Sequence, residues 1–379
     1  MHKKITLSKN MKIQPFKLER YFAKYEFSAP YLLSCSDCEP LSQHELLAMA
    51  DAKSKKLWDE LVLSYTHSQG LPELRNEIVK LYSNIKAEDL VVLAPEESIF
   101  IAMNVLIKKG DHIITTFPAY QSLYEIAKSL DANISNWEPN ESGNFDVEDL
   151  FSLATKNTRL IVINFPHNPT GETISEEQLR QIIEFARKRD IILFSDEMYR
   201  LLEYDLKDRL PSVSDIYEKG ISLSGMSKSF ALPGLRIGWL ATQNISWIEK
   251  IIEFKDYTTI CSPAPSEILA LIALQNKEQI LKRNLTIIQN NLVILEAFID
   301  RYSNIFKWNK PKAGPITFPE LMIQQDIDSF CRNLVDKKGL MLLPSSVYDY
   351  PHKKVRIGLG RNSFEKALTK LEEYLTEYL

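Results

Sequence analysis

The middle of the chain alternates short apolar runs with segments of helical periodicity. Apolar runs with the length of buried strands occur at 111–115, 159–164, 190–195, 220–223 and 237–241. Helical patterns lie between them at 97–109, 121–130 and 175–188, and the last opens with Ser175 and Gln178 at the spacing of a capping box. Strands that alternate with helices predict an α/β fold, with a mainly parallel sheet covered by helices on both faces.

The C-terminal third has a different pattern. A helical stretch runs from 266 to about 302 and is broken near Asn276. Strand-like runs follow at 316–322, 340–343 and 354–358, and helical patterns at 326–336 and 363–378. We therefore expect a large domain at 45–265 and a smaller α+β domain built from 1–44, which includes an N-terminal arm, and 266–379.

Composition and charge argue against nucleic acid and membranes as partners. The 379 residues carry 46 Lys and Arg against 50 Asp and Glu, a net charge of −4, which gives no basic surface for nucleic acid or an anionic membrane. No apolar run reaches the roughly 18 residues of a membrane span, and no secretory core follows the first ten residues. With 4 cysteines in a chain of this length, we expect a cytoplasmic protein.

Several common motifs are absent or incomplete. Cys35 and Cys38 form a lone CxxC, which is half of a zinc site, and there is no HExxH, so no metal centre is expected. Gly358 and Gly360 lack the third glycine of a dinucleotide fingerprint, and no phosphate-binding GxxxxGK[ST] loop exists. Nicotinamide and P-loop chemistry are therefore disfavoured.

Polar residues follow three of the predicted strands. Asn168 lies between two prolines in the turn 164–171, and Asp196 stands at the end of a buried strand, where a carboxylate needs a cationic or hydrogen-bonding partner. Lys228 and Arg236 lie in the third segment, 222–239. A desolvated lysine becomes a nucleophile for a carbonyl, and an arginine among apolar residues needs an anion.

These residues converge on one cofactor. An aldehyde held by Lys228, a ring nitrogen paired with Asp196 and a phosphate held by Arg236 describe pyridoxal phosphate. The carboxylate keeps the pyridine nitrogen protonated, so that the ring withdraws electrons from the α-carbon of a bound amino acid.

With these motifs the chain resembles the class I and II aminotransferases, which are pyridoxal phosphate enzymes of fold type I, from about Leu61 to the last helix. The resemblance implies a seven-stranded, mainly parallel sheet and places the cofactor on the large domain. It implies that Lys228 is the Schiff-base lysine and Asp196 the partner of the pyridinium. It further assigns Asn168 and Tyr199 to the ring's phenolic oxygen, Tyr120 to stacking on the ring, Arg236 to the phosphate and, more weakly, Ser227 to the phosphate.

Two further residues match the family outside the cofactor motifs. Tyr65 resembles the tyrosine that reaches the phosphate of the neighbouring subunit, which implies a homodimer with shared active sites. Arg356 matches the arginine that grips the α-carboxylate of the substrate, a group that suits a bidentate guanidinium, and Asn168 is expected beside it.

The chain departs from the family at the phosphate helix and at the side-chain pocket. Where a glycine-rich turn is usual, Ala94 and Pro95 precede Glu96 and Glu97, whose amides could still bind phosphate at the start of a helix. A serine usual three residues before the lysine is Gly225. Where dicarboxylate-specific members have an arginine, this chain has Tyr257, so aspartate is disfavoured as substrate; Lys255, Arg283 and Arg361 are the alternative cations.

The leading hypothesis is an aminotransferase that exchanges an amino group between an L-amino acid and a 2-oxo acid. A β- or γ-lyase or a cyclising synthase is the alternative, because the same motifs serve both chemistries. A regulatory DNA-binding protein on this fold is disfavoured, since only residues 1–44 precede the predicted large domain and the chain is acidic.

Overall fold

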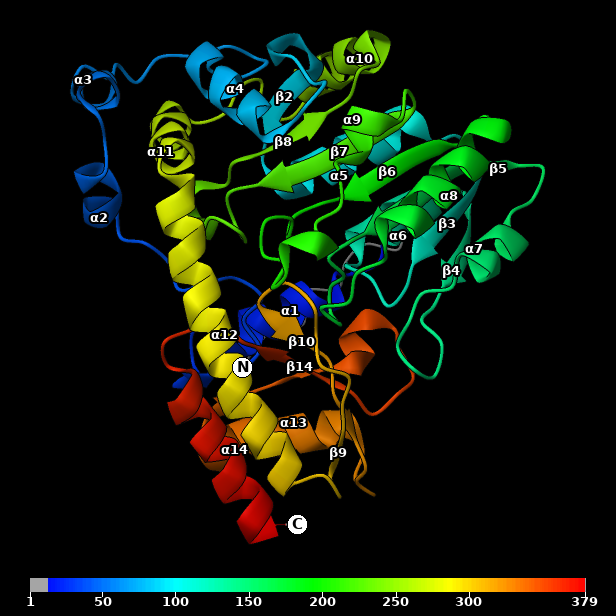
Figure 1. Cartoon of the computed structure of the whole chain (residues 1–379), viewed down its shortest axis with the longest axis vertical. Coiled ribbons are helices and arrows are strands. Elements are labelled where there is room, and N and C mark those ends of the chain that lie inside the picture. Colours follow the sequence, from blue (N-terminus) through cyan, green and yellow to red (C-terminus); the bar gives the residue numbers. More distant parts are fainter. Residues whose placement is uncertain (1–12, 379) are drawn as a thin grey trace, which may run out of the picture.

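A seven-stranded sheet organises the larger lobe of the molecule, which we call the sheet lobe (Figure 1). The structure is a computed structural model that describes residues 13–378; residues 1–12 of the predicted arm lie outside them. The strands, in the order of the sheet, are β2 (Leu90–Leu93), β8 (Gly238–Ala241), β7 (Gly220–Gly225), β6 (Ile192–Asp196), β5 (Thr158–Asn164), β3 (His112–Thr116) and β4 (Asn133–Trp137). Only β8 runs in the direction opposite to the other six strands, so the predicted mainly parallel sheet is confirmed.

Both faces of the sheet are buried, which explains why the strands read as continuous apolar runs. In β5, Leu160 and Val162 pack into one apolar cluster, and Ile161 and Ile163 pack into another on the opposite face. The helices that supply these clusters are α5 (Pro95–Leu106), α6 (Ser122–Ser129), α7 (Val147–Leu153), α8 (Glu176–Lys188), α9 (Val213–Ile216) and α10 (Ile245–Lys255), whereas α4 (Pro72–Ile78) belongs to a separate apolar cluster. The predicted capping box forms at the start of α8, where Ser175 Oγ accepts from Gln178 N.

A smaller lobe, the C-terminal lobe, follows the sheet (Figure 1). Helix α11 (Ala264–Gln275) packs against α4, and α12 (Lys277–Arg301) runs down into the second lobe, so the helical stretch is interrupted at Asn276 as predicted. The remaining elements of this lobe are β9 (Phe306–Lys307), β10 (Ile316–Thr317), β11 (Glu320–Leu321), α13 (Ile327–Lys338), β12 (Leu340–Met341), β13 (Leu343–Pro344), β14 (Val355–Gly358) and α14 (Phe364–Tyr378). The division of the chain at 45–265 stays a prediction.

Some predicted strands differ in extent from the observed ones. The run 316–322 divides into β10 and β11 around Pro319, because proline cannot donate to a strand ladder. The run 340–343 divides into β12, which pairs with β1 (Tyr31–Leu32), and β13, which pairs with β14. Strands β2 and β4 were not predicted: β2 has only four residues and β4 is a partly polar edge strand.

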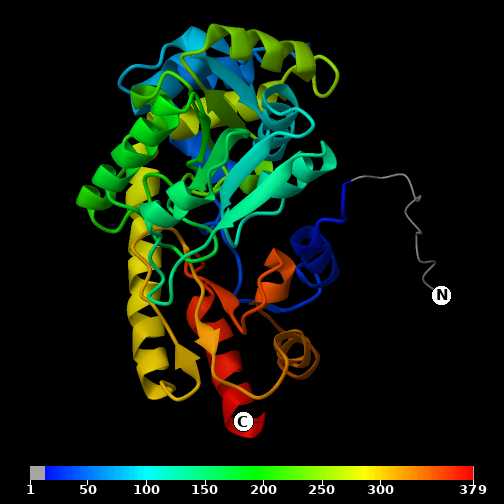
Figure 2. The same cartoon turned by 90° about the vertical axis from the view of Figure 1, so that its right-hand side faces the viewer.

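The N-terminal part of the described chain lies between and beside the two lobes. Helix α1 (Lys17–Tyr25) sits where the sheet lobe faces β14 (Figure 1, Figure 2). Helices α2 (Gln43–Ala48) and α3 (Ala52–Asp59) extend along α11 at the side of the sheet lobe (Figure 1). Short 3₁₀ turns complete the fold at Val79–Leu81, Ala87–Asp89, Leu206–Asp208, Pro233–Leu235 and Ser345–Tyr348.

Among residues 13–378, no helix combines the length and apolar character needed to cross a bilayer.

Candidate active site

A cavity of about 360 Å³ opens at the carboxyl ends of β5, β6 and β7, where ligands of parallel sheets bind. Helix α1 and strand β14 contribute its other walls. The predicted site residues that line it are Glu96, Tyr120, Asn168, Asp196, Tyr199, Ser227, Lys228, Arg236 and Arg356.

Asp196 is fixed at the end of β6. Its Oδ1 accepts from Met198 N (3.1 Å), and its carbonyl accepts from Asn164 Nδ2 (2.9 Å), so the last residues of β5 and β6 are tied together. The residue is only 6% exposed, and burial raises the pKa of its carboxyl to about 7. A carboxylate in this position gains most from a cationic partner in the cavity.

Asn168 is held by the same strand end. Its N–H donates to Asn164 Oδ1 (2.9 Å), and its side-chain Oδ1 accepts from Tyr348 OH and Arg356 Nη1 (3.3 Å each). The amide thus links the sheet lobe to the C-terminal lobe across the cavity.

Lys228 reaches the cavity from the turn after β7. Its Nζ donates to Ser36 Oγ (2.9 Å), and burial lowers the pKa of the ammonium. A lysine with a lowered pKa has more of the neutral amine that nucleophilic and base chemistry require.

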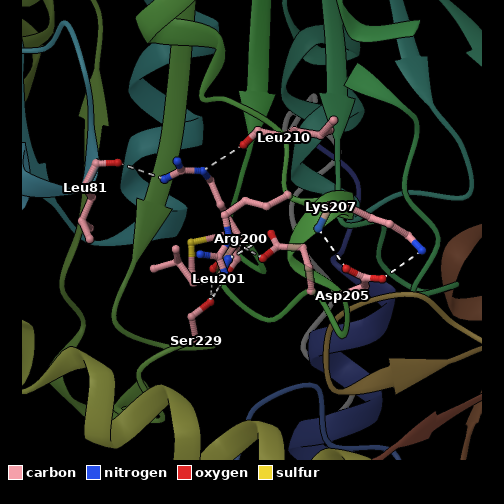
Figure 3. A network of polar contacts seen from close by, with 10 residues as sticks. Leu81, Arg200, Leu201, Asp205, Lys207, Leu210 and Ser229 are labelled. Atoms are coloured by element: carbon pink, nitrogen blue, oxygen red, sulfur yellow. Dashed lines mark hydrogen bonds and ion pairs between the residues drawn. The ribbon is translucent and has the colours of Figure 1, made fainter. Parts of the chain in front are cut away.

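Figure 3 shows polar contacts of Arg200 and Ser229, which join the turn after β6 to the turn after β7. Ser229 Oγ donates to Met198 O (3.2 Å) and Arg200 O (2.7 Å), and Arg200 Nη1 donates to Leu81 O (3.2 Å). Since Ser229 follows Lys228 directly, these bonds fix the lysine turn relative to the end of β6.

Arg356 on β14 is almost fully buried, with 1% of its surface exposed. Its Nε and Nη2 donate to Ser34 O (3.0 and 2.9 Å), and its Nη1 donates to Tyr348 OH (2.6 Å). The guanidinium is therefore oriented before any ligand arrives. Tyr348 was missed in the sequence, because a tyrosine in a C-terminal turn carries no motif.

The unusual start of α5 has a packing reason. A Cβ on Gly225 would lie 3.3 Å from Pro95 Cγ, and one on Gly238 would lie 3.0 Å from it, so these two glycines make room for the proline ring. Ser98 is the first residue of α5 whose amide bonds within the helix, to Ala94 O, which leaves the amides of Glu96 and Glu97 without helical acceptors. Glycines on the two strands that face the turn thus make room for the proline at the start of α5.

The two carboxylates at this turn point in different directions. Glu97 Oε1 accepts from Thr258 and from Thr259 (2.8 Å), so its side chain lies outside the cavity. Glu96 Oε2 accepts from Ser122 Oγ (3.2 Å) at the cavity wall, and burial raises the pKa of Glu96 to about 7. Much of the charge repulsion expected beside a phosphate is therefore removed.

Unpartnered polar groups in the cavity fit a bound pyridoxal phosphate. Ser227 Oγ and Tyr199 OH are buried and make no well-formed hydrogen bond, and burial raises the pKa of Tyr199. Arg236 is exposed although its sequence neighbours are apolar, and its backbone is left-handed (φ 55°). It donates to Pro233 O (3.1 Å) and forms no ion pair among the described residues. Together with the free amides of α5, these groups offer donors for a phosphate and a ring oxygen.

Further lining residues come from α1 and from the segment after β1. Helix α1 contributes Glu19 and Phe22, and its C-cap residue contributes Glu26; Tyr120 OH donates to Glu19 Oε1 (2.9 Å). Ser36 and Asp37 line the cavity because their segment packs on β14, where a Cβ on Gly358 would lie 2.0 Å from Cys35 O. In the sequence, the α1 residues are marked only by their helical spacing. Ser36 and Asp37 are marked only through Gly358 and Gly360, which allow a close approach of backbone.

The remaining candidates lie elsewhere. Tyr65 is 85% exposed and Tyr257 is 90% exposed. Lys255 Nζ donates to backbone carbonyls at Ser68 and Val92, and Arg283 Nη1 donates to Glu39 O. Arg361 Nη2 donates to both carboxylate oxygens of Asp37 (2.9 Å each).

Comparison with known proteins gives the family. Residues 31–371 match the family model for aminotransferase class I and II. An aspartate aminotransferase of Pyrococcus horikoshii is 27% identical, with 83% of this chain and 85% of that protein covered, and a capreomycidine synthase of Streptomyces vinaceus is 25% identical, with 74% and 72% covered. The solved structure of a pyridoxal phosphate-dependent aminotransferase from Streptococcus suis is 29% identical, has a TM-score of 0.91 and covers 97% of this chain and 99% of that one.

The fold and the cavity thus define a fold-type I pyridoxal phosphate enzyme. The chain belongs to the class I and II aminotransferase family. It is a pyridoxal phosphate-dependent aminotransferase that acts on amino acids and 2-oxo acids, and the predicted family, fold, cofactor and enzyme class are confirmed.

Proposed function

We propose that Lys228 is the catalytic residue of this aminotransferase, and that it removes and returns the proton at the α-carbon of an L-amino acid. The observation that carries the proposal is the convergence of Lys228, Asp196, Asn168 and Arg356 on one cavity at the carboxyl edge of the sheet. Pyridoxal phosphate, when bound, supplies an aldehyde for the amino group and an electron-withdrawing ring. The lowered pKa of Lys228 supports its work as a base.

The other residues would hold the cofactor. Asp196 pairs with the ring nitrogen, Asn168 and Tyr199 donate to the ring oxygen, and Tyr120 stacks on the ring. The phosphate is bound by Arg236, Ser227 and the amides of Glu96 and Glu97, whose positions at the start of α5 support this role.

Arg356 would receive the α-carboxylate of the substrate. Its guanidinium is already oriented by Ser34 O and Tyr348, which lowers the ordering cost when a carboxylate binds. Phe22 lies against the same guanidinium, 5.7 Å from ring centre to Cζ.

We further propose a homodimer, in which Tyr65 reaches the phosphate of the second copy. Support comes from large apolar side chains that are exposed in the single chain, among them Leu63 (81%), Tyr65 (85%) and Tyr257 (90%). The division into a cofactor domain at 45–265 and a second domain at 1–44 and 266–379 is also retained as a proposal. So is a cytoplasmic site of action, which four unpaired cysteines support.

The competing function is a lyase or cyclising synthase, and the relative named capreomycidine synthase favours keeping it as the second candidate. The deciding experiment mixes the loaded enzyme with single amino acids and identifies the carbon product. Recovery of a 2-oxo acid with the whole side chain supports amino-group exchange. Release of a side-chain fragment, or a cyclic amino acid, would replace it with the second candidate.

A further inference from the structure

The cavity contains more carboxylates than the proposed chemistry uses. Its acidic lining residues are Glu19, Glu26, Asp37, Glu96 and Asp196, and its cationic ones are Lys228, Arg236 and Arg356. In the roles given above, Asp196 is matched by the ring nitrogen, Arg236 by the phosphate and Arg356 by the α-carboxylate. At the α1 side of the cavity, Asp37 is paired with Arg361, and Glu19 and Glu26 are left without a cationic counterpart in these roles.

Three of these carboxylates form one wall, which we call the acidic wall: Glu19, Glu26 and Asp37. Glu19 and Glu26 are seven residues apart, so they lie on the same face of α1 and its last turn, with Phe22 between them. Asp37 comes from the segment after β1, three residues beyond Ser34, whose carbonyl holds Arg356. The wall is thus adjacent to the group expected to bind the α-carboxylate.

The three carboxylates of the wall differ in the hydrogen bonds and ion pairs that they already form. Asp37 is paired with Arg361, and Glu19 accepts one hydrogen bond from Tyr120. The Glu26 side chain has neither a hydrogen bond nor an ion pair among the described residues. Burial together with the nearby Asp37 and Glu19 raises the pKa of Glu26, and the charges of Arg361 and Lys228 offset this rise only in part. A cation beside Glu26 would relieve this crowding of like charges.

Independent features mark the same cavity as a ligand site. The hydroxyls of Tyr199 (3% exposed) and Ser227 (5% exposed) have no well-formed hydrogen bond there, and the guanidinium of Arg356 is 1% exposed and lines the same space. The acidic wall therefore faces a partly buried binding site, where a charge is less screened than at the surface.

We propose that the acidic wall, with Glu26 at its centre, binds the cationic end of the substrate's side chain, so that the amino donor is a basic amino acid with an ammonium or guanidinium group. The proposal rests on the function proposed above, since it takes Arg356 as the site of the α-carboxylate. Of the alternative cations for a dicarboxylate, Lys255 and Arg283 donate to backbone carbonyls outside the cavity, and Arg361 is already paired with Asp37. The specificity of the relatives named aspartate aminotransferase is therefore not expected in this chain.

The first test uses the loaded wild-type enzyme and compares each cationic donor with an uncharged donor of similar carbon skeleton. Lysine is paired with norleucine and arginine with citrulline, and aspartate and glutamate complete the set. A charge-assisted hydrogen bond predicts a preference of about 10- to 100-fold in kcat/KM for each cationic member. Equal rates within the pairs, or a preference for aspartate or glutamate, would overturn the proposal.

The second test changes the wall. Glu26→Gln should lower kcat/KM for lysine by about 10-fold or more, mainly through KM, and change norleucine by less than about 3-fold. Glu26→Arg should shift the preference toward glutamate, a gain that a poorly folded variant cannot produce. Glu184→Gln, which removes an exposed carboxylate on α8, is the matched control and should leave both donors unchanged. Equal losses for lysine and norleucine in Glu26→Gln would contradict the assignment.

A binding measurement separates this proposal from the proposed function. Calorimetric titration of lysine and norleucine into the loaded enzyme and into Glu26→Gln reports the charge preference whatever product forms. Tighter binding of lysine, lost in Glu26→Gln, supports the wall even if the product shows a lyase or a synthase. Whole-side-chain 2-oxo acids formed without any preference for lysine would keep the proposed function and exclude the wall.

Discussion

The cavity has two parts that are built in opposite ways. One is the acidic wall, and the other, which we call the floor, consists of Asn168, Asp196 and Lys228 at the carboxyl edge of the sheet. On the floor, Asp196 and Asn168 are bonded to the ends of β5 and β6, and their positions follow from the sheet. On the wall, Asp37 is paired with Arg361, but the Glu26 side chain has no bond among the described residues and the Glu19 side chain has a single one. The difference indicates that the floor is rigid for a chemistry that does not change, whereas Glu19 and Glu26 remain able to bond to what enters.

The wall nevertheless depends on both lobes for its position. Tyr21 OH on α1 donates to Leu342 O in the C-terminal lobe (2.8 Å), and Lys17 N donates to Gln121 Oε1 in the sheet lobe (2.9 Å). Helix α1 therefore docks on both sides of the cavity. Variants of the floor should affect every substrate, and variants of the wall should affect some substrates more than others.

The largest effect on the floor is expected at Lys228. Lys228→Ala removes the amine at the α-carbon, so turnover should fall by about 10⁴-fold or more with every amino acid. The visible absorption band of the lysine-bound cofactor should also disappear. Turnover within about 10-fold of wild type, measured beside the Glu184→Gln control, would show that Lys228 is not the base.

Asp196→Asn should separate function from stability. Turnover should fall by about 10²- to 10³-fold with all donors, because an amide cannot keep the ring nitrogen protonated.

In the cofactor-free protein the raised pKa of Asp196, about 7, means that the folded state holds its proton more tightly than the unfolded state, where the pKa is near 4. The contribution of the Asp196 carboxyl to the free energy of unfolding is therefore fully present below about pH 4. It is lost as the pH rises to about 7.

Urea unfolding of the cofactor-free protein at pH 5 and pH 8 tests the stability arm. Asp196→Asn should lose less stability than wild type between the two pH values, by an amount on the order of 1–3 kcal/mol. Glu96, whose pKa is also about 7, remains in both proteins and provides the shared background. An identical pH dependence in the two proteins would mean that folding does not raise the pKa of the Asp196 carboxyl.

The same contrast explains what the sequence could predict. Asn168, Asp196, Lys228 and Arg236 follow predicted strands, so strand pattern and residue chemistry together locate the floor. The wall was missed because Glu19 and Glu26 belong to a helix whose place is set by contacts with residues more than 100 positions away, such as Gln121 and Leu342. Sequence spacing shows that two carboxylates share a helix face, but not what that face meets.

A smaller effect, confined to substrate binding, is expected at Tyr348. Tyr348→Phe removes the hydroxyl that accepts from Arg356 Nη1, so the guanidinium loses one of its fixed partners. KM for all amino donors should rise by about 5- to 20-fold with a smaller change in kcat. Tyr217→Phe is the matched control, because it removes a buried tyrosine hydroxyl, bonded to Ile191 O, outside the cavity. If KM changes only for basic donors, Tyr348 acts on the wall and not on Arg356.

The smallest effect should come from Ser229, which supports the floor without lining the cavity. Ser229→Ala removes the bonds to Met198 O and Arg200 O that join the lysine turn to the end of β6. We expect a loss of about 1–2 kcal/mol in the free energy of unfolding and a fall in kcat of about 2- to 5-fold, because Lys228 is held less precisely. The ratio of lysine to norleucine turnover should stay constant, since the acidic wall is untouched. A change in that ratio, with kcat preserved, would show that floor and wall are coupled through this turn and are not the separate parts that their bonding indicates.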